Sequence, residues 1–299
     1  MKSILLVNLG TPAAPTAGAV RAYLAEFLSD PRVVELPRFI WLPILHGIVL
    51  RSRPAKSAEK YRLVWTDEGS PLAFHTARQA NLLSQKTGAR VEYAMRYGEP
   101  GVSSVLAKMQ DPVVVPLYPQ FSNSATGSVL DLLPKGIAAI RDFHDHPAYI
   151  GALAASMKKH WSAHGRAEKL VMSFHGLPQR TVDRGDPYQR QCIVTANLLA
   201  KELQLKSGEW ATTFQSRFGA ARWLQPYTEP TLVELARSGV SRVDVLCPGF
   251  VSDCLETLEE IGITAKAAFM RAGGREFRLI PCLNESPEWI EALAKITRV

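Results

Sequence analysis

The stretch LVNLGTP at residues 6–12 returns in altered form as MSFHGLP at residues 172–178. Each is an apolar run that gives way to glycine and proline, which is typical of a buried β-strand ending in a tight turn. Three further pairs of segments match in the same order: RYG at 96–98 with RFG at 217–219, YPQFS at 118–122 with CPGFVS at 247–252, and HPAYIGALA at 146–154 with SPEWIEALA at 286–294. Four matches in one order indicate an internal duplication.

Around these segments, short β-branched runs alternate with helical patterns, which is typical of parallel sheets built from βαβ units. The pattern predicts helices that include 19–28, 194–203 and 229–238, with Gly239 placed to end the last one. It predicts strands in two sets of four: 4–9, 90–95, 113–117 and 137–143, then 170–174, 210–215, 243–246 and 277–281. The sequence therefore predicts a duplicated α/β domain.

The composition agrees with a folded protein of two domains. The chain has 299 residues, enough for two domains of roughly 150. Apolar residues make up 46% and charged residues 21%, which excludes a disordered, collagen-like or coiled-coil protein. The net charge of +7 favours an anionic ligand or surface without naming one.

The four cysteines form no CxxC pair, so neither a disulfide framework nor a zinc ribbon is predicted, and a reducing, cytoplasmic setting is expected. The apolar run at the N-terminus stops at Asn8 and is too short for a signal peptide. The longest apolar stretch, Phe39–Leu50, contains Pro43 and is too short to span a membrane.

Open parallel sheets bind ligands beyond the carboxyl ends of their strands, so we expect the repeated loops to line a cleft between the two halves. The duplication sets His175 of the second half at the position of Leu9 in the first. This difference predicts one reactive wall and one apolar wall.

Several common functions of α/β proteins lack their sequence motifs here. No GxGxxG or GxxxxGK[ST] loop is present, which argues against dinucleotide and ATP chemistry. The nucleophile elbow GxSxG is also absent, which weakens a hydrolase interpretation. Basic residues and aromatic residues do not form a stripe, so no nucleic-acid partner is predicted.

Candidate reactive residues lie in two of the repeated loops. His175 follows a strand and precedes Gly176, although a structural, hydrogen-bonded histidine is the alternative. Asp253, Glu256 and Glu260 are spaced by three and four, which predicts one acidic face on a helix with Ser252 or Asp253 as N-cap. A solvated helix face is the alternative. Imidazole and carboxylate groups can move protons and bind a divalent metal such as Fe²⁺.

Apolar and aromatic residues on the neighbouring loops suit a flat, hydrophobic ligand, and Arg96 is placed to meet its acidic substituents. These wall residues are Leu9, Tyr118, Phe121, Trp223 and Phe250.

The sequence resembles the ferrochelatases, most of all those of proteobacteria, over essentially its whole length. The most specific motifs are SFHGLP at 173–178, RGDPY at 184–188, FQSRFG at 214–219 and PGFVSDCLETLEEI at 248–261. The resemblance implies insertion of ferrous iron into protoporphyrin IX, the last step of haem synthesis. It also implies two similar Rossmann-like domains, expected at 1–146 and 147–299, with the porphyrin held between them.

By the same resemblance, His175 and Glu256 are the paired catalytic and metal-binding residues. Leu9, Arg96, Tyr118, Trp223 and Phe250 match porphyrin-binding positions, and Asp253 and Glu260 extend the acidic face. Fe²⁺ is implied as a substrate, with no stored cofactor.

Two positions depart from relatives within the family. Some relatives bind an iron–sulfur cluster through a cysteine at the position of Asn123, so no cluster is expected here. Animal relatives have a histidine at the position of Cys254, which puts a metal relay through that residue in doubt.

The segment 38–53, RFIWLPILHGIVLRSR, has an apolar centre and basic ends, which suits contact with a lipid surface. A lid helix that packs on its own domain is the alternative. We expect a monomer in the cytoplasm, with peripheral contact at the inner membrane. His144-Asp145-His146 resembles a small metal clip, but it lies in a linking loop.

Alternative functions are a related chelatase and a non-catalytic porphyrin or haem carrier. The chelatase would act on another tetrapyrrole or metal, such as coproporphyrin with iron or sirohydrochlorin with cobalt. Turnover separates an enzyme from a carrier.

Overall fold

The computed structural model describes residues 3–217, 219 and 221–298. The chain divides into two compact units. One holds the residues up to Asp142 together with those after Ile296, and the other holds Phe143–Ile296. Each unit has its own parallel sheet.

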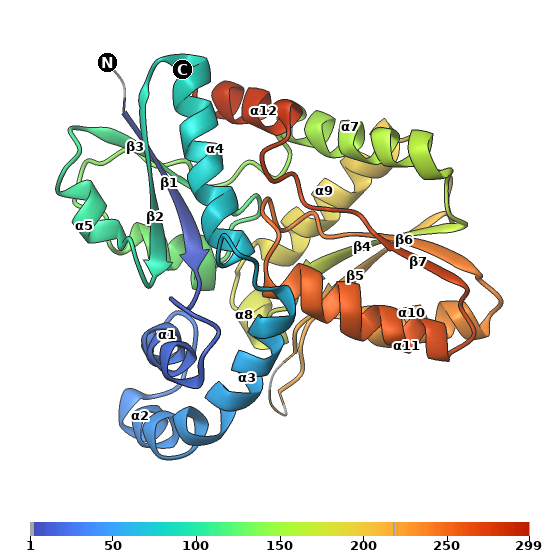
Figure 1. The fold of residues 1–299 in the computed structure, drawn as a ribbon, viewed down its shortest axis with the longest axis horizontal. Helices are drawn as coiled ribbons and strands as arrows, with labels where there is room; N and C mark the ends of the chain where they lie inside the picture. Colours follow the sequence, from blue (N-terminus) through green and yellow to red (C-terminus); the bar gives the residue numbers. More distant parts are fainter. Residues whose placement is uncertain (1–2, 218, 220, 299) are drawn as a thin grey trace. The chain divides into compact units, whose positions relative to one another are not determined.

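The first unit is built on β1 (Ser3–Gly10), which lies between β2 (Arg90–Tyr97) and β3 (Pro112–Pro116) in a parallel sheet (Figure 1). Leu5, Leu6 and Val7 of β1 are fully buried, as expected for a strand covered on both faces. The helix α4 (Pro71–Thr87) packs against β1 and β2. The helical segments of this unit are α1 (Ala17–Ser29), α2 (Arg38–Ile44), η1 (Leu45–Val49), α3 (Leu50–Val64), α4 (Pro71–Thr87), α5 (Val102–Leu106), η2 (Asn123–Gly127) and α6 (Ser128–Leu130).

The predicted strand at 137–143 is wrong, and within the part of the chain that the structure describes the first sheet has three strands. The segment runs parallel to β3 but meets it in one bridge, between Val114 and Ala139. The Val114 N–H donates to the carbonyl of Ala138, and the Ile140 N–H donates to the carbonyl of Val114, both at 2.9 Å. The next positions of β3 that face this segment are Pro112 and Pro116, which have no N–H to donate. The ladder therefore stops after one residue.

The second unit has a four-stranded parallel sheet in the order β5-β4-β6-β7. Its strands are β4 (Lys169–His175), β5 (Trp210–Gln215), β6 (Arg242–Leu246) and β7 (Glu276–Leu279). The helical segments are α7 (Pro147–His164), α8 (Gln179–Asp183), α9 (Tyr188–Glu202), α10 (Thr228–Arg237), η3 (Glu256–Ala265), α11 (Lys266–Arg271) and α12 (Pro287–Thr297). α7 packs against α9 and α10 packs against α11, and these pairs lie on opposite faces of the sheet (Figure 1).

The first three strands of each unit follow the same order: the first lies between the second and the third, and the second unit adds β7 beside its third strand. Gly239 follows α10 with φ of +98°, as predicted, and its N–H donates to the carbonyl of Ala236. The α/β class and the parallel sheets expected from the repeats are confirmed.

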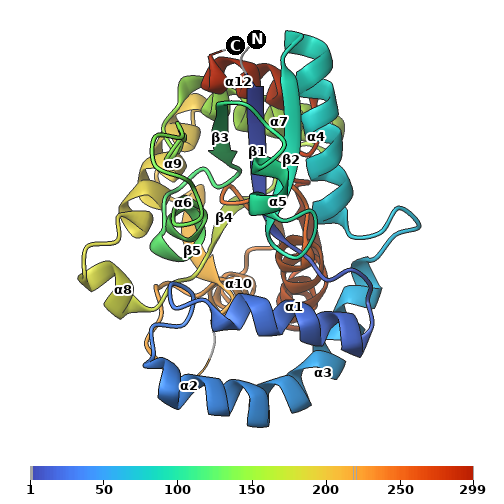
Figure 2. The same ribbon diagram turned by 90° about the vertical axis from the view of Figure 1, so that its left-hand side faces the viewer.

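The segment that includes 38–53 forms α2, η1 and the start of α3, and α1 packs against α3 (Figure 2). Trp41 is buried and its Nε1 donates to the carbonyl of Leu28 at 2.7 Å, which ties α2 to α1. Phe39 and Ile48 face outward, 80% and 64% exposed. Within the described residues, no helix combines the length and hydropathy needed to cross a membrane.

Candidate active site

His175 is the last residue of β4 and lies beside Gln215, the last residue of β5. Its Nδ1 is 2.7 Å from the carbonyl oxygen of Gly176. Because that oxygen can only accept, Nδ1 carries the hydrogen, and in the neutral ring the lone pair lies on Nε2. The His175 ring lies 6.5 Å from the ring of Phe250, which follows β6.

The turn after His175 is held tightly against its neighbours. The Gly176 N–H donates to the carbonyl of Gln215 at 2.7 Å. A Cβ at this glycine would lie 2.8 Å from that oxygen and 3.3 Å from Cε3 of Trp223, so a larger residue would displace the turn. Pro178 forms an antiparallel bridge with Trp223. The structure therefore places Trp223 and Phe250 beside His175.

The acidic segment begins differently from the prediction. The first helical hydrogen bond runs from Leu258 N to the carbonyl of Cys254, so neither Ser252 nor Asp253 is the N-cap. Asp253 precedes the helix and is buried, and its carboxylate accepts from Thr257 Oγ1 at 3.0 Å.

The partners of Asp253 from elsewhere in the chain explain this difference. The Asp253 carboxylate also accepts from Asn284 Nδ2 at 2.7 Å and from the backbone N–H of Cys282 at 3.3 Å. These residues follow β7, and their hydrogen bonds hold Asp253 outside the helix.

Glu256 and Glu260 lie in η3, a π-helix, so residues four apart are still neighbours on one side. The Glu260 carboxylate accepts from the Ser216 N–H at 2.7 Å and from the Ser216 hydroxyl. Gln215 Nε2 donates to the main-chain carbonyl of Glu256 at 2.8 Å and reaches Glu260 Oε2 at 3.3 Å. These bonds hold the start of η3, with both glutamates, against the end of β5, which is the strand beside the one that ends at His175.

Cys254 lies against Glu256 at the start of this helix. Burial raises the pKa of the Cys254 thiol well above its usual value, and the Glu256 carboxylate beside it acts in the same direction. The thiol is therefore protonated at neutral pH.

Leu9, Arg96 and Tyr118 belong to the first unit, at or near the carboxyl ends of β1, β2 and β3. Burial raises the pKa of Tyr118 well above its usual value. The Tyr118 hydroxyl is enclosed and has no hydrogen-bond partner among the described residues.

Arg96 belongs to a buried network around Asp30, which sequence patterns did not identify. Arg96 Nη2 donates to the Asp30 carboxylate at 2.5 Å, and Tyr97 and Ser128 donate their hydroxyls to the same oxygen. Burial by itself would raise the pKa of Asp30. The hydrogen bonds from Ser128, the Arg32 N–H and Tyr97, together with the Arg96 charge, lower it below its usual value.

Gln215 and Ser216 were also not singled out as site residues from the sequence. The FQSRFG motif contained a signal for Gln215, because a polar amide side chain directly follows the apolar end of a predicted strand. In the structure this amide is buried. The expected match of RFG at 217–219 includes Phe218, which lies outside the described residues.

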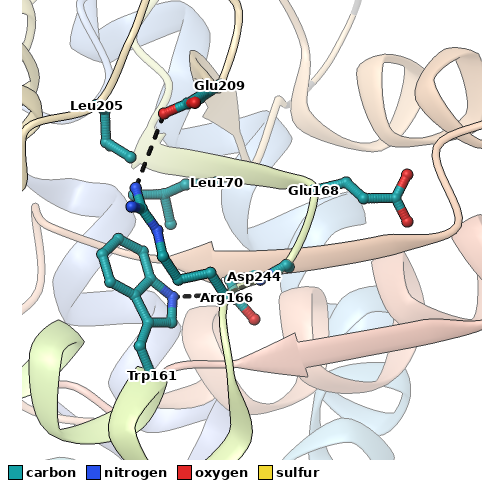
Figure 3. Close-up of a pocket in the computed structure, with 8 residues that line it drawn as sticks. Trp161, Arg166, Glu168, Leu170, Leu205, Glu209 and Asp244 are labelled. Atoms are coloured by element: carbon teal, nitrogen blue, oxygen red, sulfur yellow. Dashed lines mark hydrogen bonds and ion pairs between the residues drawn. The ribbon is translucent and has the colours of Figure 1, made fainter.

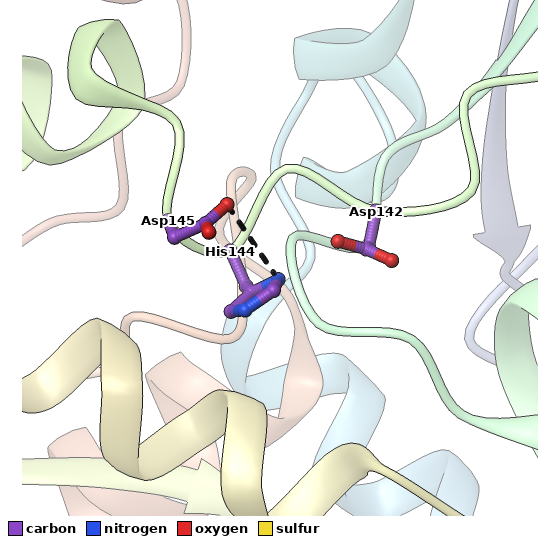
Figure 4. A group of neighbouring side chains, drawn as sticks. All are labelled: Asp142, His144 and Asp145. Carbon is purple, nitrogen blue, oxygen red and sulfur yellow. Dashed lines mark ion pairs between the residues drawn. The ribbon is translucent and has the colours of Figure 1, made fainter.

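The His144-Asp145-His146 segment, which resembles a metal clip in sequence, does not form one group of three ligands. His144 Nδ1 lies 3.9 Å from the Asp145 carboxylate (Figure 4). His146 instead accepts the Ala148 N–H at Nδ1 and so caps α7. His146 therefore serves the helix.

A pocket of about 290 Å³ lies at the other end of the second sheet (Figure 3). It includes Leu170, which is five residues before His175 on β4 and so about 16 Å away along the strand. Arg166 covers the Trp161 ring, 4.5 Å from its centre, and pairs with Glu209. This pocket contains none of the predicted site residues.

Comparisons with known proteins agree with the motifs. The ferrochelatase family model matches residues 1–299. Ferrochelatases of Aromatoleum aromaticum and of an Azoarcus species are 57% and 56% identical to this chain, with 99% of this chain and 86% of each relative covered. The ferrochelatase of Bordetella pertussis is 53% identical over 98% of this chain and 86% of its own length.

Solved structures show the same fold at low sequence identity. SirB from Bacillus subtilis, solved with Fe³⁺, matches with a TM-score of 0.54 and 13% identity, covering 100% of this chain and 95% of its own. CbiX, described as the terminal enzyme of sirohaem biosynthesis in denitrifying bacteria, matches with a TM-score of 0.52 and 15% identity, covering 100% of this chain and 98% of its own. Full-length agreement with the family model and with relatives above 50% identity shows that this chain belongs to the ferrochelatase family.

Proposed function

We propose that this protein inserts Fe²⁺ into protoporphyrin IX to form protohaem, the final step of haem biosynthesis. The observation that carries this proposal is a histidine at the end of β4 and two glutamates held against the end of the neighbouring strand β5, in a chain that matches the ferrochelatase family over its whole length. An enzyme is favoured over a carrier because these groups can move protons, which a passive binding pocket does not need.

The reaction needs a base that accepts protons and a ligand that binds the metal ion. A free-base porphyrin carries two pyrrole N–H protons that leave as Fe²⁺ enters, so total charge is conserved. His175 accepts a proton or binds Fe²⁺ at Nε2, because Nδ1 is occupied by the carbonyl of Gly176. Glu256 provides a negative charge that attracts Fe²⁺ and a carboxylate that can accept a released proton, and Glu260 and Asp253 are further acids.

We propose that Trp223 and Phe250 contact the porphyrin face, which is supported by their positions beside His175. Leu9, Arg96 and Tyr118 of the first unit are proposed as further porphyrin contacts. Arg96 is 14% exposed at its side chain and is held by Asp30, so its orientation is set before any ligand arrives.

The function is tested by anaerobic metal insertion with Fe²⁺, comparing protoporphyrin and coproporphyrin. We expect many equivalents of protoporphyrin to be converted, and coproporphyrin at least about tenfold more slowly. The reason is that coproporphyrin has carboxylates in place of the vinyl groups, which an aromatic wall accepts poorly. A carrier would bind one equivalent and quench its fluorescence without conversion. Faster conversion of coproporphyrin would reassign the substrate.

We propose that Fe²⁺ is a substrate and that the enzyme stores no cofactor. The side chain of Asn123, where some relatives use a cysteine, accepts from Arg32 Nη1 at 3.3 Å. All four cysteines are buried free thiols. Iron and sulfide are measured in the purified enzyme before the insertion assay, and we expect neither. An iron–sulfur absorbance would contradict this proposal.

We also propose that the protein is a cytoplasmic monomer whose segment 38–53 contacts the inner membrane peripherally. Support comes from the apolar face of α2 and η1: Phe39, Ile40, Ile44 and Ile48 are exposed while Trp41 is buried. Arg38 and Arg51 at the two ends are exposed and suit anionic headgroups.

The membrane proposal predicts binding to vesicles that contain anionic phospholipid. Replacing Phe39 and Ile48 together with serine should weaken co-sedimentation at least about tenfold, because two exposed apolar side chains leave the interface. Leu63→Ser is the matched control, since Leu63 is 61% exposed but lies on α3 outside the segment. Equal binding by the double variant would rule out this contact, and light scattering of the same samples tests the monomer.

A further inference from the structure

Gln215 is the buried residue at which the strands and the acidic helix of the second unit meet. It ends β5 and is 5% exposed. It pairs in register with His175, and its own carbonyl accepts the Gly176 N–H. Its side chain extends toward η3, where Glu256 and Glu260 lie.

The partners of the Gln215 amide determine which end carries the oxygen. Oε1 accepts from the Ser173 hydroxyl at 2.7 Å and lies 3.7 Å from the Cys247 thiol, and both of these groups are donors. Nε2 faces the carbonyl of Glu256 and the carboxylate of Glu260, which are acceptors. Reversing the amide would place its oxygen against the Glu256 carbonyl oxygen and the Glu260 carboxylate oxygen, which cannot donate a hydrogen bond. One orientation is therefore enforced.

The same carboxylate holds the residue that follows. Ser216 has φ of +65°, a left-handed backbone that serine rarely adopts. Glu260 accepts both its N–H and its hydroxyl, which compensates for that conformation. The end of β5 and the helix η3 are thus joined by hydrogen bonds from Gln215 and from Ser216.

We propose that Gln215 is a positioning residue, whose amide sets the place of Glu256 and the direction of the Glu260 carboxylate relative to His175. The proposal rests on the catalytic roles proposed for His175 and Glu256. Gln215 acts on the reaction through the helix that it holds, because its hydrogen bonds go to the protein. A shift of the acidic groups affects the chemical step more than it affects porphyrin binding.

The test compares Gln215→Leu and Gln215→Glu with Thr212→Val. Thr212 is a partly buried residue of the same strand, and three positions before Gln215 its side chain lies on the opposite face of the sheet, so its replacement perturbs β5 without touching the hydrogen bonds of Gln215. We expect kcat of both Gln215 variants to fall about ten- to a hundredfold, with KM for porphyrin changed less than about twofold. Thr212→Val should keep the kcat of the wild type. Thermal unfolding confirms that each variant is folded.

The Gln215→Glu variant adds a pH signature that a purely structural role would not give. Its ionised carboxylate cannot donate to the Glu256 carbonyl and repels Glu260, whereas its protonated form can donate one hydrogen bond. The ratio of its kcat to that of the wild type should therefore rise as the pH is lowered from about 8 to about 6. If Gln215→Leu does not fold, this ratio carries the test.

The outcomes separate this proposal from the proposed function. If the wild type inserts no metal, the function itself is refuted. If the wild type turns over and a folded Gln215→Leu keeps its kcat, the positioning role is refuted. An equal loss in Thr212→Val, or a pH-independent ratio for Gln215→Glu, would refute it as well.

Discussion

His175→Ala should abolish metal insertion while leaving the protein folded. The imidazole lies at the end of β4 with its Nδ1 held by the carbonyl of Gly176, and a positioned base typically contributes about a hundredfold or more to rate. The side chain is partly exposed and makes its hydrogen bond to the next residue, so its loss removes little packing. We expect kcat to fall at least about a hundredfold, measured by anaerobic Fe²⁺ insertion into protoporphyrin.

The matched control is His164→Ala. His164 is the exposed last residue of α7, and its carbonyl faces Arg278 at the opposite end of the second sheet from His175. This variant should insert metal at the rate of the wild type. Retention of full activity by a folded His175→Ala would remove the imidazole from the mechanism and favour a structural histidine.

Asp30→Asn should lower the free energy of unfolding by about 3 kcal/mol at neutral pH. Asp30 and Arg96 form a buried ion pair, with side chains 7% and 14% exposed, and the substitution leaves the guanidinium without its counter-charge. The surface control is Asp131→Asn, whose carboxylate is 54% exposed and pairs with Arg32. That pair should contribute less than about 1 kcal/mol. Urea unfolding measures both variants.

The lowered pKa of Asp30 fixes how this difference depends on pH. A carboxyl whose folded pKa lies below its unfolded value of about 3.9 stabilises the protein fully above that pH. The contribution is lost as the pH falls through the folded pKa, because the proton then binds both states. The difference between wild type and Asp30→Asn should therefore shrink below about pH 4. A difference that is constant across that range would show that the charge of Asp30 is not the cause.

The candidate site was predictable to the extent that its residues belong to motifs. His175 and Glu256 stand in continuous segments that follow predicted strands, so the sequence could place each at a strand end. The partners of these residues could not be predicted in the same way. Gln215 bonds to a carbonyl 41 positions away and Asp30 to a guanidinium 66 positions away, and no local pattern records such a pairing.

Two errors share a physical cause. The helix was expected to start at Ser252 or Asp253, but Asp253 is drawn to Asn284 and Cys282, which lie beyond β7. The expected strand at 137–143 has suitable residues of its own, yet its partner β3 offers prolines where donors are needed. Both the helix start and the strand depend on contacts with a segment distant in sequence, and these contacts outweigh the intrinsic secondary-structure preference of the local residues.

The order of apolar runs, turns and repeats in the chain was enough to predict the α/β class and the internal duplication. The resemblance of its motifs to those of the ferrochelatases was enough to indicate the family, because each motif is a short continuous segment of the sequence. Tertiary structure alone decided that the first sheet stops at three strands, that Asp30 holds Arg96, and that Gln215 joins β5 to the acidic helix. These depend on hydrogen bonds and charges between residues that only folding brings within about 3 Å of one another.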